Sequence, residues 1–170
     1  MPLIVQDPTS PTEDANSYMN LVDARALAET MAVELPVDDT EAEKAIIKAT
    51  QYINSFEKRI DGTRVNLLQS TSFPRKDATV NCEPFPEDEI PNAIKRAVIV
   101  ASGFYGQGQD MFGGVDNGRS IAREKVADLE VAYFENGATA SSISSSQIES
   151  IMSMFMCNSF GSNNILVGRY

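Results

Sequence analysis

Residues 40–60, TEAEKAIIKATQYINSFEKRI, are the stretch that decides the fold. Apolar residues recur in it at three- and four-residue spacing, which predicts an amphipathic helix with one buried face. Thr40 followed by Glu43 forms a capping box, in which each side chain accepts a backbone N–H that the helix start leaves without a partner. We expect the helix to end near Asp61-Gly62. The residues of its buried face are Ala42, Ala45, Ile46, Ala49, Ile53, Phe56 and Ile60.

Two further helices are predicted on either side of this one. Asn20 suits the N-cap of a helix over residues 21–33, which Pro36 stops. The next helix begins around Pro91, because a proline in the first turn loses no hydrogen bond there. It should dissolve in the glycine-rich residues 103–118, which we expect to form a mobile loop. Its apolar face consists of Ile94, Ala97, Val98, Ala101 and either Phe104 or Tyr105.

The segments between and after these helices carry weaker signals. Prolines forbid a long helix over residues 63–89, where Phe73 and Phe85 should plug the loop onto the core. A strand-like alternation follows at Val126, Leu129, Val131 and Tyr133, with a turn or bulge at Ala127-Asp128. Residues 136–146 are rich in serine and alanine, which predicts a flexible linker. Ser146 and Glu149 repeat the capping-box pattern and should open a short final helix.

Together these patterns predict a mainly α protein, a small bundle of three to four helices with a short β-strand or hairpin and extended terminal arms. We expect an extended N-terminal arm over residues 1–16, a helical core with the β element over residues 17–135, and a linker with a C-terminal helix and tail over residues 136–170. The side chains expected to dominate the core are Ile46, Ile53, Phe56, Phe73, Ile94 and Val98.

Net charge disfavours broad attraction to nucleic acid. The formal charge is −10 and the pI is near 4.4, so the average surface repels phosphate. The charge is uneven, because residues 44–76 carry seven bases against only Glu57 and Asp61. This alternation along the chain could pair opposite faces of neighbouring subunits, and ordinary solvated helix faces are the competing interpretation.

The residues that most enzymes and metal sites need are missing. The chain has no histidine and only two cysteines, Cys82 and Cys157, in unrelated contexts. We interpret both cysteines as small apolar side chains, since a disulfide is unusual in a reducing compartment. Gly106-Gln107-Gly108 follows a helix instead of a strand, which argues against a dinucleotide turn. The acidic run 83–89 could hold a hard cation, but it suits the dipole of the following helix better. We therefore expect no catalytic, metal or cofactor site.

The C-terminal region could be an interaction device. Its predicted helix carries Ile148, Ile151, Met152, Met154, Phe155 and Met156, which is very apolar for a helix tethered by a flexible linker. Methionines are flexible and polarisable and therefore suit an imperfectly matched partner surface. Two interpretations are equally consistent with the pattern: a docking arm that binds another protein, or a helix that folds back onto its own core.

Several segments, taken in order, resemble one family. They are similar to segments of phage head–tail connector (neck, or adaptor) proteins. These segments are the opening residues 2–7 and 15–18, the helix segment 49–53, the loop Phe73-Pro74-Arg75, the helix start 89–97 and the strand segment 123–131. This family is often labelled DnaT-like single-stranded-DNA-binding. The family loop commonly has Trp where this chain has Phe73, and residues 136–170 match no familiar tail.

This resemblance implies a structural virion protein without enzymatic activity. It implies a homo-oligomeric ring of about twelve copies beneath the portal protein, at the head–tail interface, lining the channel for double-stranded DNA. The implied partners are the portal, the next tail or neck protein and the chain itself. A chain made in the host cytoplasm fits, because no segment is apolar enough to be a signal or a membrane span. An acidic lumen would let DNA slide without sticking.

The resemblance suggests two kinds of contact for particular residues. Residues expected to pair charges between subunits are Arg75, Arg123 and Lys125, with Arg75 alternatively pairing inside the subunit. Residues expected to dock onto the portal are Ile148, Ile151, Met152, Phe155, Met156, Ile165, Leu166, Arg169 and Tyr170.

Two other functions stay open. A single-stranded-DNA-binding module would need a basic groove with stacking aromatics, for which residues 44–76 offer bases together with Tyr52, Phe56 and Phe73. A small cytoplasmic regulator of one host protein would remain monomeric when mixed with the portal, whereas an adaptor would form a ring-sized species.

Overall fold

The computed structural model describes residues 2–112, 124–126, 129–131 and 140–157. Within them it contains four α-helices: α1 (Leu21–Thr30), α2 (Asp39–Asn54), α3 (Asn92–Gly106) and α4 (Ala140–Met152). Two short 3-10 helices are η1 (Glu57–Arg59) and η2 (Ser153–Phe155). The strands form antiparallel pairs: β1 (Thr63–Arg64) with β2 (Arg75–Lys76), β3 (Thr79–Val80) with β4 (Glu83–Pro84), and β5 (Glu124–Val126) with β6 (Leu129–Val131). The expectation of a mainly helical protein therefore holds in outline, with more β pairing than predicted.

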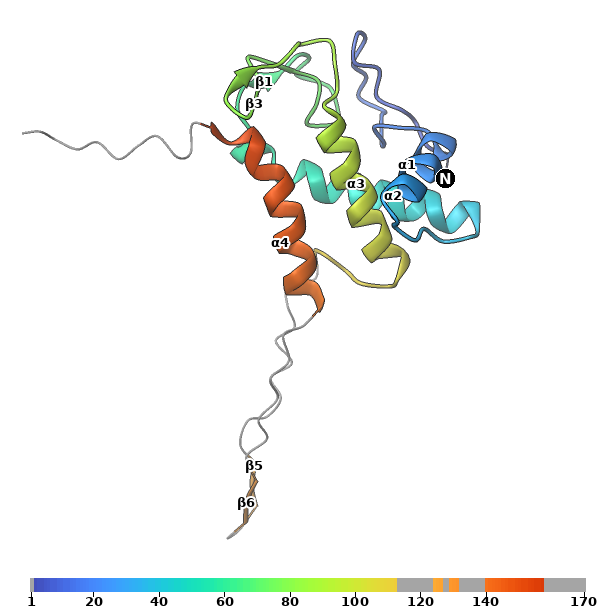
Figure 1. Ribbon diagram of the computed structural model, residues 1–170, viewed down its shortest axis with the longest axis vertical. Coiled ribbons are helices and arrows are strands. Elements are labelled where there is room, and N and C mark those ends of the chain that lie inside the picture. The colour runs from blue at the N-terminus through green and yellow to red at the C-terminus, as the bar shows by residue number, and fades with distance from the viewer. Residues whose placement is uncertain (1, 113–123, 127–128, 132–139, 158–170) are drawn as a thin grey trace, which may run out of the picture.

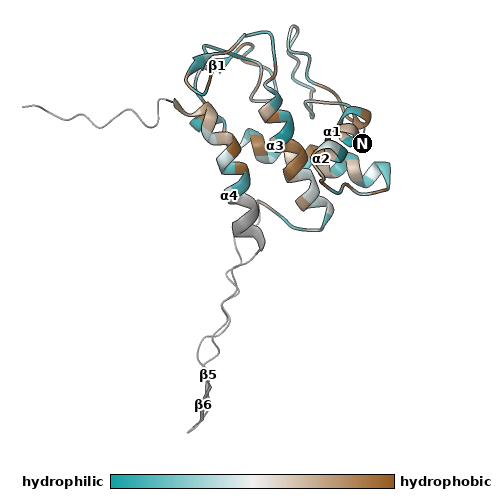
Figure 2. Ribbon diagram, in the orientation of Figure 1, coloured by the Kyte–Doolittle hydropathy of each residue, from teal (hydrophilic) through white to brown (hydrophobic). Residues whose placement is uncertain are grey.

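The central element is α3, which packs against α1 and α2 and against α4 (Figure 1). Its residues 97–103 are all buried, and Figure 2 shows apolar residues along the helix. The predicted single apolar face is therefore too narrow, because α3 has neighbours on more than one side. A helix that packs on several sides needs consecutive apolar residues, not only apolar residues along one face. The residues Val98-Ile99-Val100-Ala101 form such a run.

Helix α2 supplies the face that was predicted for it. Its N-cap is Asp38, whose carboxylate accepts a hydrogen bond from the backbone N–H of Glu41 at 3.0 Å. The predicted capping box at Thr40 and Glu43 is wrong, because Asp38 lies earlier and its negative charge also suits the helix dipole. The helix ends at Asn54, so the predicted end near Asp61-Gly62 is wrong, and the last two apolar residues of the pattern, Phe56 and Ile60, flank η1. All seven residues of the predicted face are buried.

The glycines at the end of α3 allow close packing. Residues 103–106 were expected to begin a mobile loop, but they belong to the last turn of the helix. A Cβ atom on Gly103 would lie 2.6 Å from Cγ1 of Val33, and one on Gly106 would lie 2.8 Å from Cδ of Pro36. The connection from α1 to α2 therefore lies directly against the helix, which explains small residues at these two positions better than flexibility does.

The N-terminal arm is extended, as predicted, and it is held on the core. Val5 forms a parallel bridge with Ser17, and the N–H of Gln6 donates to the carbonyl of Ser17 at 2.8 Å. The side chain of Gln6 is buried and accepts a hydrogen bond from the hydroxyl of Thr71 at 2.9 Å.

Helix α4 begins earlier than the sequence indicates. It starts at Ala140, so that Ser146 and Glu149 lie inside the helix and the predicted capping box and most of the predicted linker are wrong. Serine has a modest helix propensity, and packing can override it. Figure 1 shows α4 beside α3, and the two helices are in contact.

The strands β5 and β6 pair with each other as an antiparallel hairpin. Its register pairs Val126 with Leu129 and Glu124 with Val131, so residues 127–128 connect the strands, where the sequence predicts a turn or bulge. Those two residues and Tyr133 lie outside the described part of the chain.

Candidate functional site

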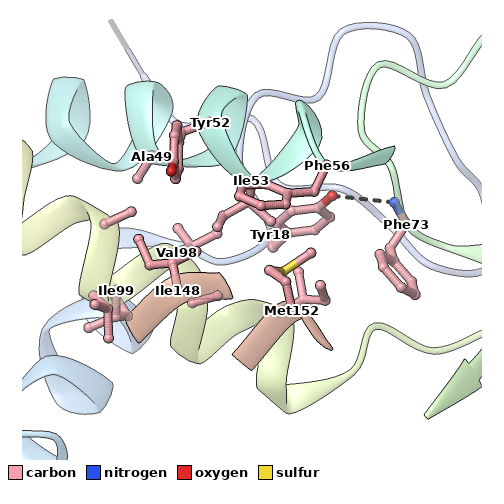
Figure 3. Close-up of a cluster of buried hydrophobic side chains, with 14 of the residues drawn as sticks. Tyr18, Ala49, Tyr52, Ile53, Phe56, Phe73, Val98, Ile99, Ile148 and Met152 are labelled. Atoms are coloured by element: carbon pink, nitrogen blue, oxygen red, sulfur yellow. Dashed lines mark hydrogen bonds between the residues drawn. The ribbon is translucent and has the colours of Figure 1, made fainter. Parts of the chain in front are cut away.

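Tyr18 joins the core to the loop that contains Phe73 (Figure 3). Its hydroxyl lies 2.7 Å from Oδ1 of Asn54 and 2.9 Å from Oγ of Ser72, and it accepts a hydrogen bond from the N–H of Phe73 at 3.3 Å. Phe73 itself is fully buried, as expected of a core plug, and its peptide bond to Pro74 is cis. The loop is thus fixed by a buried polar network as well as by apolar packing.

Burial raises the pKa of Tyr18 to about 12. The folded protein therefore holds this proton at pH values where the unfolded chain, with a tyrosine pKa near 10, releases it. Because the folded state binds more protons in this window, we expect the free energy of unfolding to fall as pH rises from about 10 to about 12, by roughly 3 kcal/mol from this group. Urea denaturation at several pH values measures the slope.

Tyr18→Phe is the matched control for this prediction. It removes the titrating group and keeps the ring, so the variant should be less stable at neutral pH but should lose less stability between pH 10 and 12. The pKa values of Tyr52 and Tyr105 are also raised by burial, so some slope should remain. Equal slopes in the two proteins would show that Tyr18 does not titrate as described.

Arg75 is a structural centre of the same loop. It is 4% exposed, and its Nε donates to the carbonyl of Asp61 at 2.9 Å. Its other nitrogens donate to the carbonyls of Ser72, Ile60 and Gly62. Burial lowers the pKa of Arg75, which the nearby charge of Glu57 opposes. Of the two roles expected for Arg75, pairing inside the subunit is therefore the one found, and a contact with a neighbouring subunit does not suit a side chain whose donors are occupied within the chain.

Glu57 links Arg75 to a second arginine. Both carboxylate oxygens of Glu57 accept hydrogen bonds from Arg64, whose Nη1 donates to the carbonyl of Gln69. One oxygen of Glu57 also lies 3.6 Å from Nη1 of Arg75. This bidentate pairing raises the pKa of Arg64. Two of the seven bases in residues 44–76 are thereby used to hold the loop.

Residues 154–157, at the end of η2, are held to residues 61, 81 and 82 by contacts that we call the C-terminal latch. Asp61 N–H donates to the carbonyl of Phe155 at 2.9 Å, and Asn81 N–H donates to that of Met154 at 2.8 Å. The N–H of Cys157 donates to Oδ2 of Asp61 at 2.9 Å, and a disulfide joins Cys157 to Cys82. The interpretation of both cysteines as free apolar side chains is therefore wrong. Their Cα atoms are 5.3 Å apart, which suits a disulfide.

The C-terminal helix folds back onto its own core. Ile148, Met152 and Phe155 are 0% exposed and Met156 is 4% exposed. Figure 3 shows Ile148 and Met152 among side chains from α2 and α3. Of the two interpretations of this helix, the fold-back is the one found, and these four residues offer no surface to a portal. Ile151 is partly buried, while Ile165, Leu166, Arg169 and Tyr170 lie outside the described residues.

Residues of η1 and the following loop line a groove of about 800 Å³, which we call the cationic groove. It contains Lys58, Arg64 and Arg75 against the single acid Glu57, so its charge is +2 in a chain of charge −10. Leu67, also in its lining, is 87% exposed, and the neighbouring Leu68 is 65% exposed. Because Arg64 is paired with Glu57 and Arg75 is buried, Lys58 is the exposed cation of this lining, and it lies with the exposed apolar Leu67.

Several other cations of residues 44–76 face acids or rings of the same chain. Nζ of Lys44 lies 2.7 Å from Oε1 of Glu41. Nη1 of Arg59 lies 3.8 Å from Oε1 of Glu149, and the guanidinium of Arg59 lies over the ring of Phe56. Lys48 lies over the ring of Tyr105. The aromatic residues that a stacking surface would need are also internal: Tyr52, Phe56 and Phe73 are all buried. Phe112, 52% exposed, contacts Tyr52 edge to face.

The structure also places the remaining predicted residues. Ile46, Ile53, Phe56, Phe73, Ile94 and Val98 are all buried in one apolar cluster. Lys125 lies in β5, opposite Glu130 of β6, and Arg123 lies outside the described residues. The sequence interpretation missed Tyr18, Asn54 and the bridging role of Glu57. One signal for the last was present, since Glu57 and Asp61 are the two acids among the seven bases of residues 44–76.

Comparisons with known proteins give one match. A protein-family model described as "Putative DnaT-like ssDNA binding protein" matches residues 1–169. No curated protein and no solved structure matches the chain. Among the described residues, none of the helices has the length and apolar character needed to span a bilayer.

Proposed function

The chain belongs to the family of DnaT-like ssDNA-binding proteins, and we propose that within this family it is a structural adaptor subunit of a tailed-phage virion. It forms a ring beneath the portal protein and works through protein–protein contacts, without catalysis. The observation that supports a structural role best is that Phe73 and Arg75, which belong to a loop that carries the family resemblance, are both buried in the fold.

The placement in a phage neck is supported by the ordered sequence resemblance over residues 2–135. Two of the segments that carry the resemblance have physical roles in the fold: Phe73-Pro74-Arg75 fixes the central loop, and the helix that begins at Asn92 is the central helix of the core. Both roles are structural. The overall charge of −10 also suits an adaptor, because an acidic channel repels passing DNA and lets it slide.

Portal attachment falls to residues 158–170 in this proposal. The sequence there includes Ile165, Leu166, Arg169 and Tyr170, which combine apolar surface with one positive charge. The residue before this segment, Cys157, is held by the C-terminal latch through its disulfide to Cys82 and its hydrogen bond to Asp61.

Single-stranded-DNA binding is the second candidate, and the family description favours it over the adaptor role. The surface feature that suits it is the cationic groove, with Lys58 in its lining. Against it stand the net charge and the burial of Tyr52, Phe56 and Phe73, because nonspecific binding of single strands depends on clustered cations and stacked aromatics.

Two measurements on the full chain separate these candidates. Native mass spectrometry of the chain mixed with the portal protein of the same phage should show a ring-sized complex. Fluorescence anisotropy with a labelled oligothymidine should show no binding at micromolar protein. The opposite pair of results, a monomer beside the portal and salt-dependent oligonucleotide binding, would replace the adaptor proposal with the DNA-binding one.

A further inference from the structure

The turn between β3 and β4 carries a cysteine at a position whose backbone favours glycine. Asn81 and Cys82 connect the two strands, and their φ angles are 52° and 67°. Two-residue hairpin turns with positive φ at both positions prefer asparagine followed by glycine, because a β-carbon is crowded in this conformation. Asn81 follows this preference and Cys82 does not. The disulfide to Cys157 explains the departure, since a glycine could not form it.

The disulfide can be reached from solvent. Cys82 is exposed and Cys157 is half-buried. Both cysteines line an opening of about 430 Å³, together with residues such as Ser153 and Met154. A small thiol reductant can therefore reach a sulfur atom without unfolding the protein. Exposed disulfides of this kind are the labile or regulatory ones, whereas buried ones resist reduction.

The bond fastens the last residue of the C-terminal latch. The latch also contains hydrogen bonds donated by the N–H groups of Asp61, Asn81 and Cys157, with lengths of 2.8–2.9 Å. Because α4 ends at Met152, residues 153–157 are a short segment beyond the helix. Once the bond is broken, these hydrogen bonds and local packing hold the segment, and no covalent link keeps it beside the β3–β4 turn.

From this arrangement we propose that the Cys82–Cys157 disulfide is a redox switch that controls the C-terminal latch. The thiolate of a dithiol reductant attacks Sγ of Cys82, and Cys157 leaves as a thiolate that takes up a proton. The second thiol of the reductant then displaces Cys82, which leaves two protein thiols and an oxidised, cyclic reductant. Two electrons pass to the protein. A reducing compartment opens the latch and an oxidising one closes it. This switch does not depend on the adaptor function.

Amide hydrogen exchange in the full-length chain tests the switch. NMR follows the exchange without denaturant, in the presence and absence of dithiothreitol. If the rest of the fold stays intact, the bond closes only the short stretch between α4 and Cys157, so its loss should raise the open population about 30-fold. We expect exchange at the N–H groups of Asp61 and Asn81 to accelerate by this factor. The N–H of Gln6, which donates to the carbonyl of Ser17, is the internal reference and should change less than about twofold.

Three results would overturn the proposal. A disulfide that dithiothreitol reduces only after urea is added would show that the sulfur atoms are inaccessible in the folded protein. Equal acceleration at Gln6 would show a global loss of stability in place of a local release. Unchanged exchange at Asp61 and Asn81, in a chain whose mass confirms two added hydrogens, would show that the latch does not depend on the bond.

The double variant Cys82→Ser with Cys157→Ser is the matched control. It keeps two small side chains but cannot form the bond, so exchange at Asp61 and Asn81 should be fast both with and without dithiothreitol. Slow exchange in this variant would contradict the switch. A response of the variant to dithiothreitol would assign the effect to the reductant itself and would contradict the switch as well.

Discussion

Removing residues 141–170 should unfold the protein, whereas removing residues 158–170 should leave it folded. The longer deletion takes away nearly all of α4 and η2, and with them Ile148, Met152 and Phe155, all of which are fully buried. Losing a buried side chain of this size costs about 2–5 kcal/mol. Three such losses match or exceed the roughly 5–15 kcal/mol that stabilises a typical domain.

The longer deletion also removes the C-terminal latch. Backbone donors at Asp61 and Asn81 would lose their carbonyl partners, and Cys82 would lose its disulfide. Circular dichroism during heating and urea denaturation measure the outcome: a cooperative transition for the shorter deletion and none for the longer. A cooperative, near-native transition after deletion of residues 141–170 would contradict the burial of α4 against α3.

This prediction reverses what the sequence alone suggests about the C-terminal region. The serine-rich approach to Ile148 predicted a linker, because serine competes with helical hydrogen bonds and favours caps and turns. Packing of the apolar face against α3 overrides that local preference, and periodicity does not reveal which surface a face will meet. The even choice between docking arm and fold-back could be resolved only by the positions of the other helices.

Elsewhere too, local sequence patterns could be predicted, whereas contacts between distant segments could not. The buried face of α2 could be read from its period, and Asn20 caps α1 as expected, with its side chain accepting from the N–H of Asp23. The role of Gly103 could not be predicted, because a glycine that allows close approach to Val33 and a glycine that loosens a loop look alike in sequence. The Cys82–Cys157 pair depends on proximity across a sequence separation of 75, which composition does not encode.

The network around Arg75 was the least predictable part of the candidate site. Its partners are backbone carbonyls in residues 60–72, and their positions are fixed only when the loop has folded. The sequence showed many bases with two acids among them and suggested contacts between subunits. Folding instead uses Arg64 and Arg75 internally, which leaves fewer cations for either a neighbouring subunit or DNA.

Replacing Arg75 by methionine should destabilise the folded protein by roughly 3–5 kcal/mol, because it leaves Glu57 and several buried carbonyls with fewer partners. Methionine fills a similar volume, so the loss would come mainly from the missing donors. Arg75→Lys should recover little, since an ammonium group cannot reproduce the planar donors that meet separate carbonyls. The free energy of unfolding from urea denaturation measures both effects.

Arg59→Met is the matched control for Arg75→Met. Both substitutions remove an arginine from the same basic segment and therefore change the net charge equally. The side chain of Arg59 is 55% exposed, however, and its Nη1 lies 3.8 Å from a carboxylate oxygen of Glu149. An exposed pair of this kind contributes at most about 1 kcal/mol, so the control should stay close to the parent protein.

The comparison also separates a structural Arg75 from an interfacial one. If Arg75 served mainly to bind a neighbouring subunit, Arg75→Met would impair assembly while its free energy of unfolding stayed within about 1 kcal/mol of Arg59→Met. If the hydrogen bonds to Asp61 and Ser72 define its role, stability falls first and assembly fails only as a consequence. Assembly measured at a temperature where the variant is still folded therefore distinguishes the two, and we expect the folded variant to assemble.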